Sequence, residues 1–490
     1  MSKAGTQVIE VGVISADATL LHHVKKLCQE FDYSFSSWLN LEQFMNADPD
    51  CLVVITNSSE HKGSSQDNAA ECCQAAKGIC NDAFVVCIVH KTIKKEQLTF
   101  LKKSGADLIL LDHQLTEMSK LEFLLTQQLK ARFIPIKASE LSPDSTIFFS
   151  ILHLIQHRSK FLPCALPGLL TAEHLSKLSR ASELYINRRD LHEFRKYLEN
   201  RPSRSSKDLI SRCRIRFLCL CATYAELVLL LTDQAESATL DKGSALLAQC
   251  RSLCSNLVSN IAEFEDVWEV IDTSAIGNMG SVERSTAVAT YVATFGLRMD
   301  IDNLPDAMIG ALLCDIGLIL LNSDILKKIK LNLPLNTEEY TQYILHPLNS
   351  IELALASRIQ LNTTLRKIIE MTHERYDQKG FPNQSPPNRI SLESQLIQFC
   401  KELDTRTLVK LGELKRNPRM IREHWIQESI ADTKQFSPEF CRQLKMTWGH
   451  ISDDSITAHK EDRPIPALDQ GPDVGEPVAQ HLLKLDIKKP

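Results

Sequence analysis

The chain has 490 residues, of which 43% are hydrophobic and 24% are charged, and its formal net charge at pH 7 is −5. These values are ordinary for a soluble globular protein, and the length is enough for roughly three domains of about 100–200 residues each. The negative net charge argues against partners that bind to basic surfaces, namely nucleic acid and anionic membranes.

Cysteine usage and hydropathy indicate a cytoplasmic protein. The 15 cysteines lie in apolar stretches and form no CxxC pair, so the sequence predicts buried, reduced thiols and no zinc ribbon. Residues 1–15 lack the charged and apolar regions of a signal peptide. The longest apolar run, 217–231, contains Glu226 and is shorter than the roughly 20 residues of a membrane span, which predicts a buried helix and no membrane insertion.

Residues 1–131 alternate short apolar runs with amphipathic segments. The expected strands are residues 8–15, 51–56, 83–90 and 106–112, and the expected helices are residues 20–31, 69–79, 94–104 and 117–130. This alternation predicts a doubly wound parallel sheet with helices on both faces. The order of the elements, with Gly105, Ala106 and Asp107 opening the last strand, resembles a response-regulator receiver domain.

The resemblance to a receiver implies a phosphorylation site whose chemistry this chain has lost. It implies an acid pair for magnesium after the first strand, a phosphate-accepting Asp, a conserved Ser/Thr and a Lys. The corresponding residues here are Ser15 and Ala16 (followed by Asp17), Ile55-Thr56-Asn57, Val89 and Asp112. Without the carboxylates there is neither a magnesium ligand set nor a nucleophile, so we expect a pseudo-receiver used for docking or dimerisation.

The middle of the chain changes character twice. Residues 132–200 hold short β-like runs separated by Pro and Gly and then helical segments, which predicts a small β-rich module with helices. Residues 201–275 have apolar positions at helical spacing and predict a helical connector. Residues 451–490 have few large apolar side chains and predict a flexible tail.

Residues 276–450 predict an all-helical domain with a candidate metal site. Asp315, His346 and His373 fall on three different predicted helices, and one Asp with two His is a usable ligand set for a divalent ion. The spacing of these residues fits equally a buried acid and two histidines on helix surfaces.

The order of short motifs in this region resembles the HD-GYP family, helical metal-dependent phosphodiesterases that hydrolyse the bacterial second messenger cyclic di-GMP. The motifs are ALLCDIG, LHPLNS, THERYDQKGFP, a helix with KELD, and QFSPEF. The signature loop of the family is matched by Glu374, Arg375, Asp377, Gly380 and Pro382, with Phe381 in place of the tyrosine. The resemblance implies the fold of the family and a bacterial source.

The metal ligands that the resemblance implies are only partly present. Asp315, His346 and His373 are kept, as a vestigial set that we expect to be empty. Six positions depart from the family pattern: Cys314, Thr372 and Ser281 replace histidines, Lys401 replaces an aspartate, Gly277 replaces a glutamate and Leu318 replaces a lysine. Three ligands hold one ion at most, whereas this hydrolysis needs two or three. We expect Lys401 to lie in the metal cavity, pair with Asp315 and replace the cation.

These departures predict a non-catalytic signalling protein, an HD-GYP pseudoenzyme that acts through protein contacts or nucleotide sensing in cyclic di-GMP signalling. We expect no cofactor, or at most one divalent ion, and a protein partner such as a diguanylate cyclase domain at the 374–382 loop; a homodimer is a further expectation. Two alternatives stay open. One is a residual phosphodiesterase with one ion on Asp315, His346 and His373. The other is a receptor that binds cyclic di-GMP without cleaving it, with Arg375 and Lys379 supplying positive charge.

Overall fold

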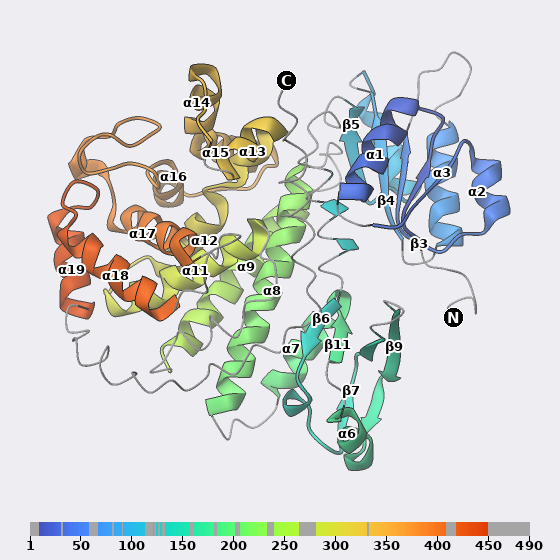
Figure 1. Cartoon of the computed structure of the whole chain (residues 1–490), viewed down its shortest axis with the longest axis horizontal. Coiled ribbons are helices and arrows are strands. Elements are labelled where there is room, and N and C mark those ends of the chain that lie inside the picture. Colours follow the sequence, from blue (N-terminus) through green and yellow to red (C-terminus); the bar gives the residue numbers. More distant parts are fainter. Residues whose placement is uncertain are drawn as a thin grey trace, which may run out of the picture. The chain divides into compact units, whose positions relative to one another are not determined.

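The computed structural model describes residues 9–30, 33–57, 67–80, 83–90, 92–112, 121, 124–125, 128–129, 133–155, 160–180, 184–200, 206–232, 240–263, 281–330, 333–407 and 418–448 (Figure 1). Most of the helix expected at 117–130, together with Gly277 and the predicted tail 451–490, lies outside these residues. The chain divides into two compact units. The N-terminal unit comprises residues 1–247, 322–331 and 357–359, and the C-terminal unit comprises the rest.

The N-terminal unit begins with a five-stranded parallel sheet. Its strands are β1 (Ile9–Ile14), β2 (Phe35–Trp38), β3 (Cys51–Asn57), β4 (Phe84–Val89) and β5 (Leu108–Leu111), in the order β2-β1-β3-β4-β5. The predicted parallel sheet is thereby confirmed, and its order is one of the two common doubly wound orders. The sequence did not predict β2, because its four residues, FSSW, form no apolar run.

Side-chain alternation along the strands explains why helices cover both faces of this sheet. In β3, Val53 and Ile55 face the core that α1 (Ala18–Glu30) completes, whereas Val54 faces the core built with α2 (Leu41–Ala47), α3 (Asp67–Ile79) and α4 (Lys95–Lys103). All three side chains are fully buried. Strands buried on both sides read as continuous apolar runs, which is the pattern that identified them in the sequence.

The acid nearest the end of β1 is committed to helix capping. Asp17 Oδ1 accepts hydrogen bonds from the backbone N–H groups of Thr19 at 2.8 Å and Leu20 at 3.3 Å, at the start of α1. The hydroxyl of Ser15 accepts the backbone N–H of Asp17 at 2.9 Å. At the end of β3, Thr56 is 1% exposed and Asn57 follows it. The receiver-like assignment itself stays a prediction.

A small β-rich region follows in the same unit. An antiparallel sheet has the order β6-β11-β8-β9, formed by β6 (Phe133–Ile136), β11 (Leu184–Asn187), β8 (Ile151–Ile155) and β9 (Lys160–Ala165). A second pair joins β7 (Ser145–Ile147) to β10 (Gly168–Leu170). The helices α6 (Ala172–Leu178) and α7 (Leu191–Glu199) complete the region. The domain boundaries at 131, 200, 275 and 450 stay predictions.

A buried ion pair ties this region to the long helix α8 (Ser206–Thr232). Arg214 on α8 donates to both carboxylate oxygens of Glu140, at 2.8 and 2.7 Å, and to the Pro135 carbonyl at 3.1 Å. The Arg214 side chain is 5% exposed and that of Glu140 1%, so the bidentate geometry satisfies two charges that water cannot reach.

Helix α8 also contains a long apolar stretch. Among the described residues, Leu209–Thr232 has the length and composition of a membrane span, but 89% of its most apolar window is buried inside the structure. Core helices of soluble proteins pass the same test, and the predicted buried helix agrees with this burial.

The C-terminal unit is helical, as predicted. It contains α11 (Ser281–Arg298), α12 (Leu304–Leu313), a 3₁₀ segment η7 (Ile316–Leu320), α14 (Thr337–Ile344), α15 (His346–Ala356), α16 (Thr363–Glu370), α17 (Leu392–Thr407), α18 (Pro418–Ala431) and α19 (Pro438–Trp448). Helix α9 (Leu240–Ile261) crosses the boundary between the units, and α13 (Ser323–Lys330) belongs to the N-terminal one.

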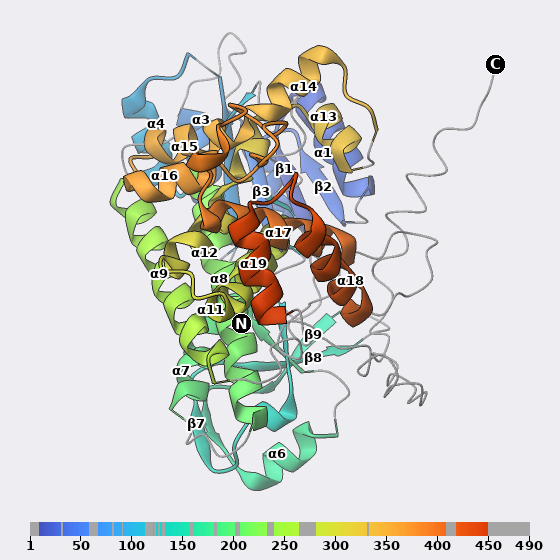
Figure 2. The same cartoon turned by 90° about the vertical axis from the view of Figure 1, so that its left-hand side faces the viewer.

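Helix α12 is the centre of the C-terminal unit and fixes the position of the residues that follow it. It packs against α11, α16 and α17, and every side chain from Ala307 to Leu313 is buried (Figures 1 and 2). Gly310 permits the close contact with α16, because a Cβ atom there would lie 2.6 Å from Ile368 Cγ2. A helix that is apolar on all sides belongs in a core, so its C-terminal end is held rigidly.

We predict that the N-terminal unit cannot be phosphorylated. The positions that need acids hold Ser15, Ala16 and Thr56-Asn57, and Asp17 already caps α1. Incubation of the full chain with acetyl phosphate and magnesium should leave its intact mass unchanged. A stoichiometric phosphoryl adduct that maps to residues 1–131 would contradict the prediction, and a genuine receiver domain treated in parallel is the positive control.

Candidate functional site

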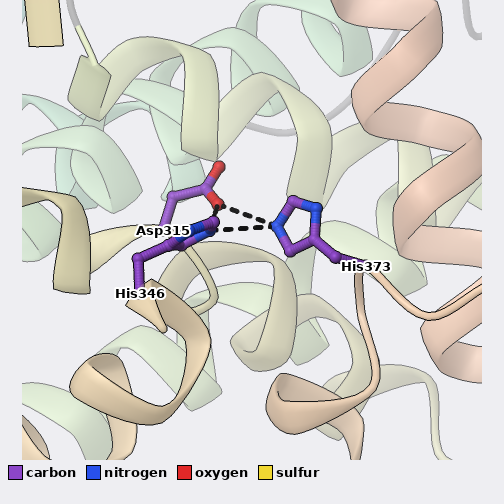
Figure 3. A group of neighbouring side chains, drawn as sticks. All are labelled: Asp315, His346 and His373. Atoms are coloured by element: carbon purple, nitrogen blue, oxygen red, sulfur yellow. Dashed lines mark hydrogen bonds and ion pairs between the residues drawn. The ribbon is translucent and has the colours of Figure 1, made fainter. Parts of the chain in front are cut away.

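Four elements of the C-terminal unit converge on one cluster of polar side chains. Asp315 lies between α12 and η7, and His346 is the first residue of α15. His373 follows the end of α16, and Lys401 lies in the middle of α17. The three residues predicted as a vestigial ligand set, Asp315, His346 and His373, therefore do meet, and their side chains point toward one another (Figure 3).

A close backbone contact brings Asp315 to His346. A Cβ atom on Gly317 would lie 2.1 Å from the His346 carbonyl oxygen and 2.8 Å from the Ser350 nitrogen, so only glycine fits between η7 and α15. The Ser350 hydroxyl accepts the Gly317 N–H at 2.8 Å and lies 3.0 Å from the Cys314 carbonyl, to which it can donate. This buried contact positions the carboxylate beside the imidazole.

The polar atoms of the three residues lie within one coordination radius of a common point. His346 Nε2 is 3.2 Å from Asp315 Oδ1 and 3.1 Å from His373 Nε2, and His373 Nε2 is 3.5 Å from Asp315 Oδ1 (Figure 3). Taken by itself, this geometry suits a divalent ion with nitrogen and oxygen ligands.

The ammonium group of Lys401 lies beside these atoms. Its Nζ is 2.5 Å from Asp315 Oδ1, 2.9 Å from His373 Nε2 and 3.9 Å from Cys314 Sγ. The Lys401 side chain is 20% exposed, so it is directed inward and not to solvent. The expected pairing of Lys401 with Asp315 is present in the structure.

The two charges stabilise each other. Burial opposes ionisation of Asp315, but the Lys401 ammonium outweighs it and holds the pKa of Asp315 well below its usual value. Burial likewise opposes the charge on Lys401, and the Asp315 carboxylate outweighs it, so the pKa of Lys401 is raised. Both groups are therefore ionised near neutral pH, and their formal charges cancel.

The other two groups near the ammonium are uncharged. Burial, followed by repulsion from Lys401, lowers the pKa of His373 to about 3, which leaves the ring neutral and able to accept from the ammonium. Burial and the nearby Asp315 carboxylate raise the pKa of the Cys314 thiol to about 12. A thiol that stays protonated is a poor metal ligand, since metals bind the thiolate.

Two aromatic residues, of which only Phe381 was predicted from the sequence, contact the imidazole rings. The Tyr343 carbonyl accepts a hydrogen bond from His346 Nδ1 at 2.7 Å, which orients that ring from α14. The Phe381 ring stacks on His373 with centroids 4.6 Å apart and planes 12° apart. Phe381 was predicted only as a member of the signature loop. No residue pattern indicates the contact of Tyr343, because this contact is made by a backbone atom.

The 374–382 loop is held by its own polar residues. Glu374, predicted as an interaction residue, is 1% exposed and accepts the backbone N–H groups of Asn383 and Ser385 at 2.8 and 2.9 Å. Arg375 forms two hydrogen bonds with Asp377, both at 3.0 Å. Glu374 is thus enclosed by the loop, whereas Arg375 and Asp377 pair with each other where the Arg375 side chain is still 33% exposed.

Gly380 and Pro382 have different environments in the same loop. A Cβ atom on Gly380 would lie 2.4 Å from the Arg375 nitrogen and 2.5 Å from the His373 carbonyl oxygen, so the loop folds tightly onto His373 only with glycine at this position. Pro382 is partly exposed beside Phe381.

The structure describes some of the remaining predicted positions. Thr372 is fully buried and its hydroxyl donates to the Ile368 carbonyl at 2.8 Å, so it turns toward its own helix. Leu318 is partly buried in η7, Ser281 begins α11, and Gly277 is outside the described residues. Asp404, three residues after Lys401 on α17, accepts from Arg284 Nε at 2.9 Å and is not a member of the cluster.

The residues as arranged do not fit a divalent metal ion. Lys401 takes the carboxylate oxygen and the His373 nitrogen that an ion would need. An ammonium about 4 Å from a divalent ion costs about 8 kcal/mol at an effective dielectric near 20. The ion could enter only after Lys401 moves away from Asp315.

One stretch of the C-terminal half matches the model of a known protein family. Residues 257–421 match the family model described as "HD domain", a stretch that starts in α9, ends in α18 and includes all four residues of the cluster. No curated protein matches the chain. A solved structure of an HDG"Y"P protein from Bdellovibrio bacteriovorus aligns with 64% of this chain and 98% of its own length, at 17% identity and a TM-score of 0.40. This structural likeness is too loose to carry information on function.

We predict that removal of Lys401 strands the Asp315 charge. Lys401→Met should lower the free energy of unfolding of the C-terminal unit by about 2–4 kcal/mol, because a partly buried carboxylate loses its partner. Lys401→Met combined with Asp315→Asn should cost clearly less than the sum of the single changes, since the two positions share one interaction. Urea unfolding in the presence of chelator provides the measurement.

Tryptophan fluorescence can be restricted to the relevant unit for this measurement. A Trp38→Phe, Trp268→Phe background leaves Trp425 and Trp448, which lie on α18 and α19. Strict additivity of the two substitutions would show that Lys401 and Asp315 do not interact, and would contradict the geometry.

We predict that acid destabilises the metal-free C-terminal unit through His373. The pKa of His373 is about 3 when folded and about 6.5 when unfolded, so the unfolded state binds a proton first as the pH falls. Stability should therefore decrease from pH 6.5 downward, by about 2 kcal/mol at pH 5, since each pKa unit is about 1.4 kcal/mol. Asp315, with its lowered pKa, contributes only below its unfolded value near 4, outside this window.

The pH effect is tested by unfolding His373→Gln protein and the wild type between pH 5 and 8 in the same fluorescence background. The variant should lose most of the slope between pH 5 and 6.5. The exposed His22, in the N-terminal unit, serves as the matched control when changed to Gln. An unchanged slope in His373→Gln would refute the prediction.

Proposed function

We propose that this chain is a non-catalytic, bacterial signalling protein whose C-terminal half is a degenerate HD-GYP domain acting in cyclic di-GMP signalling through protein contacts. An HD domain at residues 257–421 supports the family, and the order of the signature motifs within it supports the HD-GYP branch. The single observation that carries the loss of catalysis is the position of Lys401 Nζ, 2.5 Å from Asp315 Oδ1.

The chemical reason lies in what hydrolysis of a phosphodiester demands. Metal-dependent cleavage uses ions to generate a nucleophilic hydroxide and to bind the phosphate oxygens. In this chain the ammonium neutralises the one carboxylate of the cluster, His373 accepts from that ammonium, and Cys314 remains a thiol. None of these groups has a pKa suited to deprotonate water near neutral pH.

The shape of the domain nevertheless survives, which is why we propose a role in binding. The Lys401 ammonium supplies the positive charge beside Asp315 that a metal ion would otherwise supply. The elements that carry the cluster can therefore stay together without a metal. We propose that the exposed tip of the loop, at Gln378 and Lys379, contacts a protein partner such as a diguanylate cyclase domain. Arg375 is engaged by Asp377, which leaves Lys379 as the exposed base of the loop.

Four measurements on the whole chain test this proposal together. Elemental analysis after dialysis against manganese and iron should find no stoichiometric metal. Incubation with cyclic di-GMP should give no linear product. Calorimetric titration with cyclic di-GMP, and a binding assay with a purified diguanylate cyclase domain, should separate the kinds of partner. Lys379→Glu should weaken the protein contact and leave metal content unchanged.

A gain-of-function variant provides the internal control. Lys401→Asp removes the ammonium and restores an acid, so it should bind close to one divalent ion per chain, through Asp315, His346, His373 and the new carboxylate. The outcomes discriminate between the three hypotheses. Hydrolysis by the wild type with bound metal would overturn the proposal in favour of a residual phosphodiesterase. Binding of cyclic di-GMP without hydrolysis would replace protein contact by nucleotide sensing.

A further inference from the structure

Helix α15 presents an apolar face that its own domain does not cover completely. Leu345, just before the helix, and Leu355 near its end are each 40% exposed, Glu352 is exposed, and Leu348 and Ile351 are half-buried. We call these five residues the α15 face. Four of the five are large aliphatic side chains, and such a group on a surface marks an interaction site more often than single exposed residues do.

Helical spacing makes the five residues contiguous. The backbone N–H of Asn349 donates to the Leu345 carbonyl at 3.0 Å, so the helical spacing of α15 already starts at Leu345. The other members follow Leu345 by three, six, seven and ten residues, which at about 100° per residue places all five within about 120° of arc. The opposite side of the helix holds its buried residues, namely His346, Pro347, Ser350 and Ala354.

The charge of the face is negative. Glu352 is its charged member, and the stretch 331–357 contains no Lys or Arg. Of the elements that pack against α15, η7 has no charged residue, α14 has only acids, and α16 adds Arg366 and Lys367 on a neighbouring helix. An apolar face that carries a carboxylate is complementary to an apolar segment that carries ammonium groups.

The chain contains a segment with that complementary pattern, at positions outside the described residues. Residues 478–489 read VAQHLLKLDIKK, in which six of the first ten residues are apolar and three lysines face one aspartate in number. Val478, Leu482 and Leu485 recur at i, i+4 and i+7, the spacing of the anchors that an amphipathic helix lays on an apolar surface. The preceding stretch 449–477 is different, with seven acids and two bases.

We propose that residues 478–489, the tail segment, dock on the α15 face of the same chain. In this arrangement the leucines of the segment pack against Leu348 and Leu355, and Lys484 pairs with Glu352. The docked segment covers the exposed apolar surface, so any other protein that uses the α15 face has to displace it first. The inference is independent of whether the polar cluster is catalytic.

The tether between the two parts is long enough and favours the contact. Helix α19, which ends at Trp448, and helix α15 belong to the same compact unit. A flexible chain with the 29 residues of 449–477 has a root-mean-square span of about 30 Å, and a domain of this size has a radius of gyration of about 16 Å. The segment can therefore reach any side of the unit.

Covalent attachment also compensates for the small area of the face. Four aliphatic side chains offer a few hundred Å², less than the roughly 800 Å² per partner of a standard interface between separate proteins. A tethered segment meets the face at an effective concentration on the order of millimolar, so a weak contact is still populated.

Charge disfavours the two other occupants of such a face. A second copy that used the same face in a two-fold contact would bring its own Glu352 close to this one, and like charges across an interface lower affinity. An anionic lipid surface attracts apolar patches that are surrounded by Lys and Arg, whereas the α15 face carries a carboxylate.

Hydrogen–deuterium exchange of the full chain, read by mass spectrometry on a peptide that contains residues 478–489, tests the proposal. In the wild type these amides should exchange about three- to tenfold more slowly than in the free synthetic peptide, because docking protects them. Leu355→Glu should return them to the rate of the free peptide. Met446→Glu is the matched control, since this methionine is 67% exposed on α19, outside the face, and it should leave the protection unchanged.

A charge exchange tests the pairing of Lys484 with Glu352. Glu352→Lys and Lys484→Glu should each reduce the protection by about two- to fivefold, as expected for an exposed ion pair, and the two changes together should restore most of it. Because Glu352 is exposed, this arm does not depend on whether Leu355→Glu folds, which circular dichroism checks.

Three results would overturn the proposal. The first is a wild-type segment that exchanges at the rate of the free peptide. The second is protection that remains in both Leu355→Glu and Glu352→Lys, which would place the segment on another surface. The third is protection that increases with protein concentration, which would show that the segment binds a second copy and not its own chain.

Discussion

The ion pair between Lys401 and Asp315 is the interaction on which the candidate site depends. A carboxylate held between two imidazoles inside a helical domain needs a positive charge, and burying it alone would cost several kcal/mol. In a metalloprotein the ion provides that charge. Here a covalently attached ammonium, 2.5 Å away, provides it from α17. The cluster is consequently complete in the absence of any ligand, and its geometry does not depend on the supply of metal.

An ammonium in the place of a metal ion supports the polar cluster without supplying the chemistry of a metal. A divalent ion polarises water and phosphate, whereas an ammonium has no vacant coordination position and a single charge. The packing around the cluster does not involve the ammonium. Gly317 allows η7 to touch α15, and Gly380 allows the loop to fold onto His373. Helix α12 anchors the domain through its buried surface. These contacts are made by backbone and apolar atoms, so they do not depend on which cation is present.

Much of this could be predicted from the sequence because it depends on local patterns. Continuous apolar runs identified β1, β3, β4 and β5, and the motif order identified a helical domain in which Asp315, His346 and His373 converge. The proximity of Lys401 to Asp315 followed from the resemblance to the family pattern, in which the two positions hold ligands of the same site.

Prediction failed where a structural feature does not depend on which side chain is present. Strand β2 has no apolar run, and the Tyr343 contact uses a backbone carbonyl that any residue possesses. Glu374 looked like a surface acid, and only the tertiary fold shows that two backbone N–H groups enclose it.

Helix α14 has a consequence for the motion of the site. This helix of eight residues is fixed by an Asn336–Glu339 capping box, yet none of its side chains is buried. Elements with so little buried surface open locally at a small fraction of the free energy that unfolds a core helix. Each opening withdraws the Tyr343 carbonyl from His346 Nδ1, while the contacts of His346 Nε2 with Asp315 and His373 remain. We therefore expect the nitrogen resonance of His346 Nδ1 to change whenever α14 opens, which makes this ring a natural reporter of anything that binds to that helix.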